Sequence, residues 1–364
     1  MTSEIQYDCE GCAAPLSYAP GTTSLTCGFC GRNQRIEPPA DEEKTVRELD
    51  FERVLRDRGP GLPAEELMQG GHEVRCEDCG SHSVLVGQAG RCPFCDSPMV
   101  AEVDAATVSY LSPESVLPFY IDRESSRDAF RGWVKSRWFA PNDLAQRARE
   151  SKIDGVYMPY WTYDSQTTNR YVGQRGEHYY VSESYTDSEG NRRTRQVMKT
   201  RWYPASGLVS VAFDDVLIYA SNSLPRDLIQ RLEPWDLSAL EPYDPAYLSG
   251  FIAERYRVGL EPGFELAEAR MKPSIRAAVR RDIGGDAQRI SRLETHHDAI
   301  TFKHCLLPLW ISSFRYDEKV YRFIVNARTG EVAGERPYSV IKIVLTALLV
   351  IALFYGALVL MEGG

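Results

Sequence analysis

Hydrophobic and polar positions follow different patterns in successive parts of the chain. In the first hundred residues, apolar runs at 24–26 and 83–91 are bounded by glycine and cysteine, which predicts short strands joined by hairpin turns. Proline-rich stretches lie between these runs and predict a connector. Within it, a short amphipathic helix is indicated by the spacing of Val46, Leu49, Val54 and Leu55.

Aromatic residues become frequent from about Asp104 onward. Ser126 is a candidate N-cap for a helix in this region. The apolar face of that helix is predicted by the spacing of Phe130, Trp133, Val134 and Trp138.

Two segments of this aromatic region, 156–176 and 305–330, are similar to each other. Each contains a Pro-x-Trp motif followed by strand-forming residues, a polar turn and a closing glycine. The motifs are Pro159/Trp161 and Pro308/Trp310. The similarity predicts an internal duplication, in which a β-rich domain is made of two similar halves. The first copy continues into 177–207, which predicts a long hairpin that turns near residues 187–191.

The C-terminal part of the chain is apolar all round. Ile343 to Met361 form a run of 19 residues without a charge, and about 20 apolar residues are needed to cross a bilayer as a helix. The run predicts a transmembrane helix over 341–361, with a buried core helix as the alternative. Arg336 and Lys342 precede it, so we expect the N-terminal side to lie in the cytosol.

Eight of the nine cysteines form four Cys-x-x-Cys pairs. The first four are Cys9, Cys12, Cys27 and Cys30, and the second four are Cys76, Cys79, Cys92 and Cys95. Two residues between cysteines let both sulfurs of a pair reach one ion, and four thiolates complete a tetrahedral Zn²⁺ site without an open position. This spacing resembles the zinc ribbon and predicts two structural Zn²⁺ ions.

Disulfides or an iron–sulfur site are the alternatives for these cysteines. No signal peptide is recognised before the first pair, so we expect a reducing cytosol, which favours metal binding.

These patterns together predict an α+β fold class, with two N-terminal zinc ribbons, a mixed α+β domain with an internal duplication, and one C-terminal transmembrane helix. The expected domains are zinc ribbon 1 over 1–37, a helical linker over 38–72, zinc ribbon 2 over 73–103, the α+β soluble domain over 104–338 and the transmembrane helix over 341–361.

The net charge of −9 is concentrated at one end of the chain. Residues 1–103 contain 9 Lys and Arg against 18 Asp and Glu, which accounts for the whole excess. Phosphate binding relies on clustered basic side chains. We therefore expect the ribbons to contact proteins rather than nucleic acid.

The predicted hairpin has the opposite character. Because strand side chains alternate, one face is expected to carry Arg193, Arg195, Lys199 and Arg201. Tyr179, Tyr180 and Tyr185 lie on the opposing strand. Three interpretations remain open: contact with nucleic acid, contact with anionic lipid head groups, or a solvated face whose charges pair with acidic residues such as Glu177 and Glu183.

No phosphate-binding loop, zinc-protease motif or nucleophile elbow occurs in the sequence. We therefore expect a protein that is not an enzyme. His296, His297 and Asp298 lack a further metal ligand at a recognisable spacing. Cys305 follows His304 within an apolar run, and a buried cysteine is expected there rather than a nucleophile.

The cysteine pairs occur together with "MPYWTYD", "FDDVLIYAS", "LSGFIAERY", "KHCLLPLW" and "NARTGEVAGERPYS" before the apolar tail. In these motifs the chain resembles a bacterial family of tail-anchored double zinc-ribbon proteins, often labelled TFIIB-type zinc ribbon or primosomal-helicase-like. The resemblance covers most of the chain. It implies a role in membrane stress beside phage-shock and SPFH-type proteins. The helicase label would require ATPase motor motifs, and the sequence has none.

Two functions follow as hypotheses. The first is an adaptor or scaffold in the bacterial cytoplasmic membrane, with its bulk in the cytosol, that recruits protein partners. The alternative is a nucleic-acid-binding protein that tethers DNA or a replication or transcription complex to the membrane.

Overall fold

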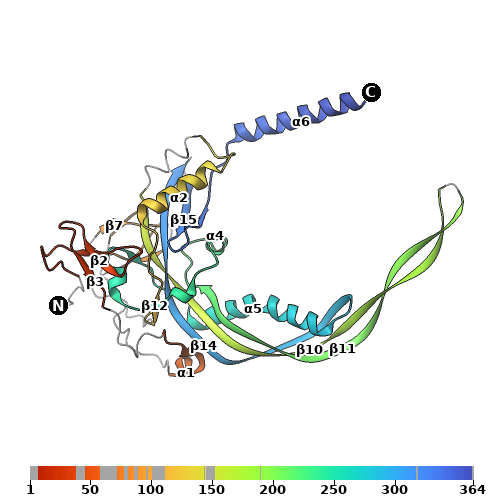
Figure 1. Ribbon diagram of the computed structural model, residues 1–364, viewed down its shortest axis with the longest axis horizontal. Helices are drawn as coiled ribbons and strands as arrows, with labels where there is room; N and C mark the ends of the chain where they lie inside the picture. Colours follow the sequence, from red (N-terminus) through yellow and green to blue (C-terminus); the bar gives the residue numbers. More distant parts are fainter. Residues whose placement is uncertain are drawn as a thin grey trace.

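We describe the fold from a computed structural model (Figure 1). The structure describes residues 7–37, 46–57, 72–77, 81–85, 89–95, 97–100, 111–142, 144, 152–188, 190–316 and 319–362.

Small antiparallel sheets form the N-terminal region. The first sheet consists of β1 (Leu16–Tyr18), β2 (Ser24–Cys27) and β3 (Asn33–Arg35). Two further pairs follow, β5 (His72–Arg75) with β6 (His82–Leu85) and β7 (Ala89–Arg91) with β8 (Pro98–Val100). Strands occupy both predicted apolar runs, since β2 covers the first and β6 and β7 cover parts of the second, but β6 pairs with β5 and β7 with β8 rather than with each other.

Three very long antiparallel strands form the body of the molecule. β10 (Asp154–Thr186) pairs on one side with β11 (Arg192–Tyr219) and on the other with β14 (Ala287–Tyr316). The sheet continues through β15 (Lys319–Asn326) to β16 (Val332–Gly334). Short strands at its margins are β4 (Leu49–Asp50), β9 (Ser115–Val116), β12 (Glu241–Pro242) and β13 (Ile252–Ala253).

The predicted hairpin is the outer part of this sheet. Pairing between β10 and β14 ends at Gly176 and Ala287, whereas β10 and β11 remain paired as far as Thr186 and Arg192. Residues 177–201 therefore form a two-stranded projection, which we call the arm. Figure 1 shows the arm extending far beyond the rest of the molecule.

The two Pro-x-Trp motifs lie on adjacent strands. Tyr157 is opposite Pro308 and Pro159 is opposite Leu306, so the two copies are related by a local two-fold axis between β10 and β14. The indole N–H of Trp161 donates to the carbonyl of Val258 and that of Trp310 to the carbonyl of Ile121, both at 2.8 Å. This placement is compatible with an internal duplication, which stays a prediction.

One long helix lies along the inner side of the curved sheet (Figure 1). This helix, α5 (Leu260–Ile283), buries Ala267, Met271 and Ile275 in one hydrophobic cluster with Trp161 and Tyr163. Close packing requires a glycine at position 263, because an added Cβ would lie 2.3 Å from the hydroxyl of Tyr163. Shorter helices are α1 (Phe51–Asp57) and α4 (Arg226–Gln230).

The helix predicted after Ser126 begins earlier than the sequence suggested. α2 spans Arg123–Lys135, and its N-cap is Asp122, whose carboxylate accepts the N–H of Ser125 at 2.7 Å. Ser126 is a buried residue within the first turns. Phe130 and Val134 are buried as predicted, but Trp138 lies beyond the helix and is 73% exposed.

The prediction of a C-terminal transmembrane helix is wrong. Within the described part of the chain, no helix combines the length and the apolar character needed to cross a membrane. The C-terminal helix of the structure is α6 (Val340–Glu362). The first turn of α6 is held to the body, because Lys342 Nζ donates to the carbonyl of Ala140 at 2.7 Å.

The absence of a membrane-spanning helix among the described residues also corrects the predicted fold class and the predicted location. Strand outweighs helix in the structure, and the expected α+β arrangement with a membrane span is replaced by a mainly β architecture. The single-pass, tail-anchored location in the cytoplasmic membrane and the bilayer contact through the last helix rested on that span.

A reciprocal contact joins the segment before β9 to β14. The backbone N–H of Glu114 donates to the carbonyl of His304 at 2.9 Å, and the N–H of His304 donates to Glu114 Oε2 at 2.7 Å. Burial raises the pKa of the Glu114 carboxyl to about 7. Burial also lowers the pKa of the His304 imidazole to about 4.

We predict that Glu114→Gln removes a pH-dependent penalty on folding. The folded-state pKa of Glu114 is raised, so its ionisation destabilises the fold as pH increases from the ordinary value of 4.5 to about 7. The free energy of unfolding of the variant, relative to the wild type, should increase by about 3 kcal/mol over this interval. Urea unfolding at a series of pH values measures this difference. Titration of His304 is common to both proteins, and a difference that does not change with pH would contradict the prediction.

Candidate metal centres

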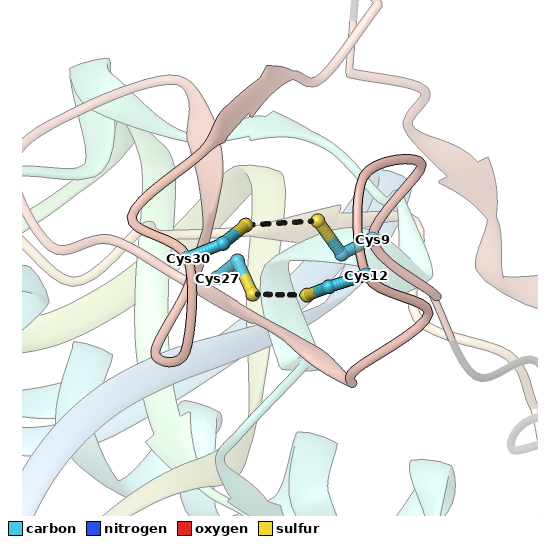
Figure 2. A group of neighbouring side chains, drawn as sticks. All are labelled: Cys9, Cys12, Cys27 and Cys30. Atoms are coloured by element: carbon cyan, nitrogen blue, oxygen red, sulfur yellow. Dashed lines mark hydrogen bonds between the residues drawn. The ribbon is translucent and has the colours of Figure 1, made fainter.

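The first four cysteines converge on one point (Figure 2). The Sγ atoms of Cys9 and Cys30 are 3.5 Å apart, as are those of Cys12 and Cys27. Each cysteine of one Cys-x-x-Cys pair therefore faces one of the other pair. Cys9 and Cys27 are buried, whereas Cys12 and Cys30 are exposed, so the cluster lies at the margin of the module.

This geometry matches a tetrahedral thiolate site. Four sulfurs about 2.3 Å from one Zn²⁺ ion are about 3.8 Å from each other, which is close to the observed separations. No disulfide is formed among these residues, which are free thiols. The cluster can hold a metal ion with four protein ligands.

Backbone N–H groups around the cluster favour thiolates. The N–H of Gly11 lies 3.4 Å from Cys9 Sγ and is the main cause of the lowered pKa of that thiol. The N–H groups of Cys30 and Phe29 lower the pKa of Cys27 to about 6. Since a metal binds the thiolate rather than the thiol, these donors prepare the sulfurs of Cys9 and Cys27 for coordination.

The second group brings together three cysteines among the described residues. Cys76, Cys92 and Cys95 are all buried, and their sulfurs are close enough to share a metal ion. Cys76 Sγ is 3.5 Å from Cys95 Sγ. Cys79, the predicted fourth ligand, lies outside the described residues. The hydroxyls of Ser81 and Ser97 lie 3.2 Å from Cys92 Sγ and 3.4 Å from Cys95 Sγ.

Both cysteine modules pack against the body. The first shares a hydrophobic cluster with Val116, Phe119 and Trp310 through residues that include Leu16 and Tyr18. The second contributes to another cluster with Leu117, Val156 and Ile324 through Val74, Cys76, Cys92, Phe94 and Cys95. Arg322 Nε also donates to the carbonyl of Phe94 at 2.8 Å. The sequence did not indicate this docking, because each module has few apolar residues of its own.

The four predicted basic residues do share one face of the arm. Arg195 is opposite Glu183 and Lys199 is opposite Tyr179 across the hairpin, and paired residues point to the same side. Their charges have partners within the arm. Arg193 pairs with Asp187 at 2.7 Å and Lys199 with Glu183 at 2.8 Å. Arg195 and Arg201 lie over the rings of Tyr185 and Tyr179, at 5.4 Å and 5.1 Å from their centres.

The remaining residues singled out in the sequence have structural partners. His297 lies between Ser165 Oγ at 3.0 Å and Glu268 Oε1 at 3.5 Å, and burial lowers the pKa of its imidazole. His296 is exposed and pairs with Asp298 at 3.1 Å. Cys305 is fully buried, as expected, and burial raises the pKa of its thiol well above the ordinary value.

One acidic group was missed from the sequence. Asp164, Asp214 and Asp215 come together where the register between β10 and β11 shifts. Lys303 Nζ lies 2.6 Å from Asp215 and supplies a positive charge at this position. The consecutive acids Asp214 and Asp215 in "FDD" were the only signal in the sequence. The position of Asp164 opposite them depends on the register between β10 and β11.

Comparison with known proteins places the chain near one bacterial relative. It is 26% identical over 340 residues to a protein of Bacillus subtilis (strain 168) described as "Uncharacterized protein YdjG", covering 92% of this chain and 91% of the relative. No model of a known protein family matches the chain. No solved structure matches it.

We predict two bound metal ions per chain, one in each cysteine module. Cys12→Ser changes an exposed ligand of the first cluster and should remove one ion, because three thiolates hold the metal more weakly than four. Cys76→Ser should remove the other ion independently. Elemental analysis of the purified full chain measures the stoichiometry.

Cys305→Ala provides the matched control, since it also removes a buried thiol but Cys305 is not among the ligands of either cluster. It should retain both ions. Full metal retention in Cys12→Ser and Cys76→Ser would show that these cysteines are not ligands.

Proposed function

We propose that both cysteine modules hold structural Zn²⁺ and that the protein is a non-enzymatic adaptor that binds protein partners through its first module. Zinc suits the site because it prefers four soft thiolates in tetrahedral geometry. With all four positions filled by cysteine, the ion has no place for a water or a substrate. Its role is then to fix the shape of the module.

A single observation carries the adaptor proposal. Phe29 is 82% exposed, and it lies between Cys27 and Cys30 at the tip of the second Cys-x-x-Cys turn. Both flanking cysteines belong to the metal cluster, so the ring is presented on a metal-fixed turn. Rigid exposed aromatic residues are frequent anchors of protein interfaces.

Strand β1 of the same module is fixed to the body. Ser249 Oγ donates to the carbonyl of Leu16 at 2.6 Å, and the N–H of Tyr18 donates to the carbonyl of Ser249 at 2.9 Å. The Tyr18 ring also packs edge-on against Tyr247, with centres 5.2 Å apart. The module therefore presents Phe29 from a defined position, which lowers the entropy lost on binding.

We predict that Phe29→Ala abolishes partner recovery without affecting the metal. Proteins crosslinked to the full chain in cells would be purified and quantified for wild type and variant. A central aromatic anchor contributes 2 kcal/mol or more, which corresponds to a loss of about thirtyfold in affinity. Trp138→Ala is the matched control, because Trp138 is also a largely exposed aromatic residue and lies outside the cysteine modules. An unchanged set of partners for Phe29→Ala would refute the proposal.

A second candidate function is nucleic-acid binding by the arm. The observation that favours it is the shared face of four basic residues with Tyr179 and Tyr185. Two of the cations lie over tyrosine rings and are not in ion pairs within the described part of the chain, namely Arg195 and Arg201. Base stacking on tyrosine combined with phosphate contacts is a common mode of single-strand binding.

We predict for this candidate that Arg195→Gln combined with Arg201→Gln weakens binding of single-stranded DNA. Each lost phosphate contact should reduce the slope of log affinity against log salt by about one. Gel-shift titrations at several salt concentrations measure the slope. Arg280→Gln combined with Arg281→Gln on α5 removes the same charge elsewhere and serves as the control. Absence of binding by the wild type at low salt would exclude this function.

A further inference from the structure

The first metal cluster contains two kinds of cysteine. Cys12 and Cys30 are exposed, whereas Cys9 and Cys27 are only 3% and 1% exposed. Each Cys-x-x-Cys pair therefore contributes one cysteine that solvent can reach and one that it cannot. This difference matters chemically, because exposed thiolates react with dissolved oxidants and buried structural cysteines are inert.

Small, exposed residues stand next to the two reachable cysteines. Gly11 and Ala13 on either side of Cys12 are exposed, and so is Gly31 after Cys30. A side-chain carbon added at Gly31 would meet no other atom within 4 Å. A small dissolved oxidant therefore has open space from which to approach the exposed side of the cluster.

Each exposed cysteine faces a buried one across the cluster (Figure 2). Cys12 Sγ lies 3.5 Å from Cys27 Sγ, and Cys30 Sγ lies 3.5 Å from Cys9 Sγ. A sulfur that is oxidised at either exposed position thus has a second sulfur in contact with it. A reactive cysteine beside a resolving cysteine is the usual arrangement of a redox-sensitive thiol site. To form a disulfide, the two sulfurs must approach by about 1.5 Å.

We propose that Cys12 and Cys30 are sites of oxidation by hydrogen peroxide, and that the first module exchanges its metal ion for two disulfides. The exposed thiolate attacks the peroxide, so that its sulfur gains an oxygen, the O–O bond breaks and hydroxide leaves. The facing thiolate then attacks the sulfenic acid, forms the S–S bond and expels a second hydroxide. The two hydroxides take up two protons and become water. For each disulfide, two thiolates are oxidised and one peroxide is reduced.

Oxidation removes the ligands of the metal ion. The first disulfide uses two of the four thiolates, and the remaining two hold the ion much more weakly, so it is released. The links from Cys12 to Cys27 and from Cys30 to Cys9 join the same two turns that the ion joins. This inference rests on the metal site proposed for the first module, and it adds the regulation of that site by an oxidant.

The Cys76→Ser chain, which lacks a ligand of the second ion, reports on the first module alone. The metal-loaded full chain would be treated with hydrogen peroxide, and its metal content measured by elemental analysis after gel filtration. The content should fall from one ion per chain to none. Mass spectrometry should find peptides in which Cys12 is linked to Cys27 and Cys30 to Cys9. Dithiothreitol with added Zn²⁺ should restore the ion, because disulfides are reducible whereas sulfonic acids are not.

Two matched variants of the buried cysteines test the pairing. Cys27→Ser deprives Cys12 of its partner and should form only the disulfide between Cys30 and Cys9. Cys9→Ser also removes one buried ligand, and it should form only the other disulfide. In Cys27→Ser, the sulfenic acid that remains on Cys12 should react with dimedone, whereas the fully buried Cys305 should stay unlabelled.

The outcomes separate this inference from the metal site on which it rests. An ion that stays bound under peroxide would overturn the inference and leave the metal site standing. Disulfides formed within a Cys-x-x-Cys pair, in place of those between the pairs, would overturn it as well. A metal content that Cys12→Ser leaves unchanged would refute the metal site, and the inference with it.

Discussion

The structure depends on the pairing of β10 with β14. These strands are far apart in the sequence, yet they pair antiparallel from Asp154 and Ile311 to Gly176 and Ala287, with two local register shifts. Each of the four hydrophobic clusters contains a side chain of β10, namely Tyr157, Met158, Trp161 and Tyr171. Because Met158 lies on one face of the strand and Tyr157, Trp161 and Tyr171 lie on the other, a slip by a single residue would exchange their environments. The register therefore determines the whole core at once.

The cysteine modules depend on the same strands. Modules of this size cannot bury enough apolar surface to fold alone, and a metal ion ordinarily supplies the missing free energy. Here the candidate metal ligands Cys9 and Cys27 also belong to the cluster that contains Tyr157 and Trp310. Binding of a metal ion and docking would consequently stabilise each other. The modules form part of the body rather than separate heads on a connector, and a partner that contacts Phe29 contacts the whole molecule.

Local chemistry was predictable from the sequence, whereas long-range contacts were not. The four thiols of the first cluster come together because their spacing is local, and the hairpin at 187–191 follows from its own turn residues. The N-cap was placed at Ser126 because its type is suitable, but Asp122 lies one turn earlier and its carboxylate binds the free N–H of Ser125. The terminal apolar run predicted a membrane span from its composition alone. The acidic group at Asp164 needed the register of β10 with β11, which no local pattern contains.

The arm shows why a pattern of residue types can have a structural cause. An isolated two-stranded hairpin is marginally stable in water, and residues 177–201 have no third strand or helix beside them in the described structure. Cross-strand pairs are then the main source of stability. The ion pair of Lys199 with Glu183 and the stacking of Arg195 on Tyr185 are such pairs. The alternation of basic and aromatic residues that suggests a nucleic-acid surface is thus also what an unsupported hairpin requires. The two explanations are a binding surface for nucleic acid and the stabilisation of an unsupported hairpin. Measuring the affinity of this face for nucleic acid distinguishes between them.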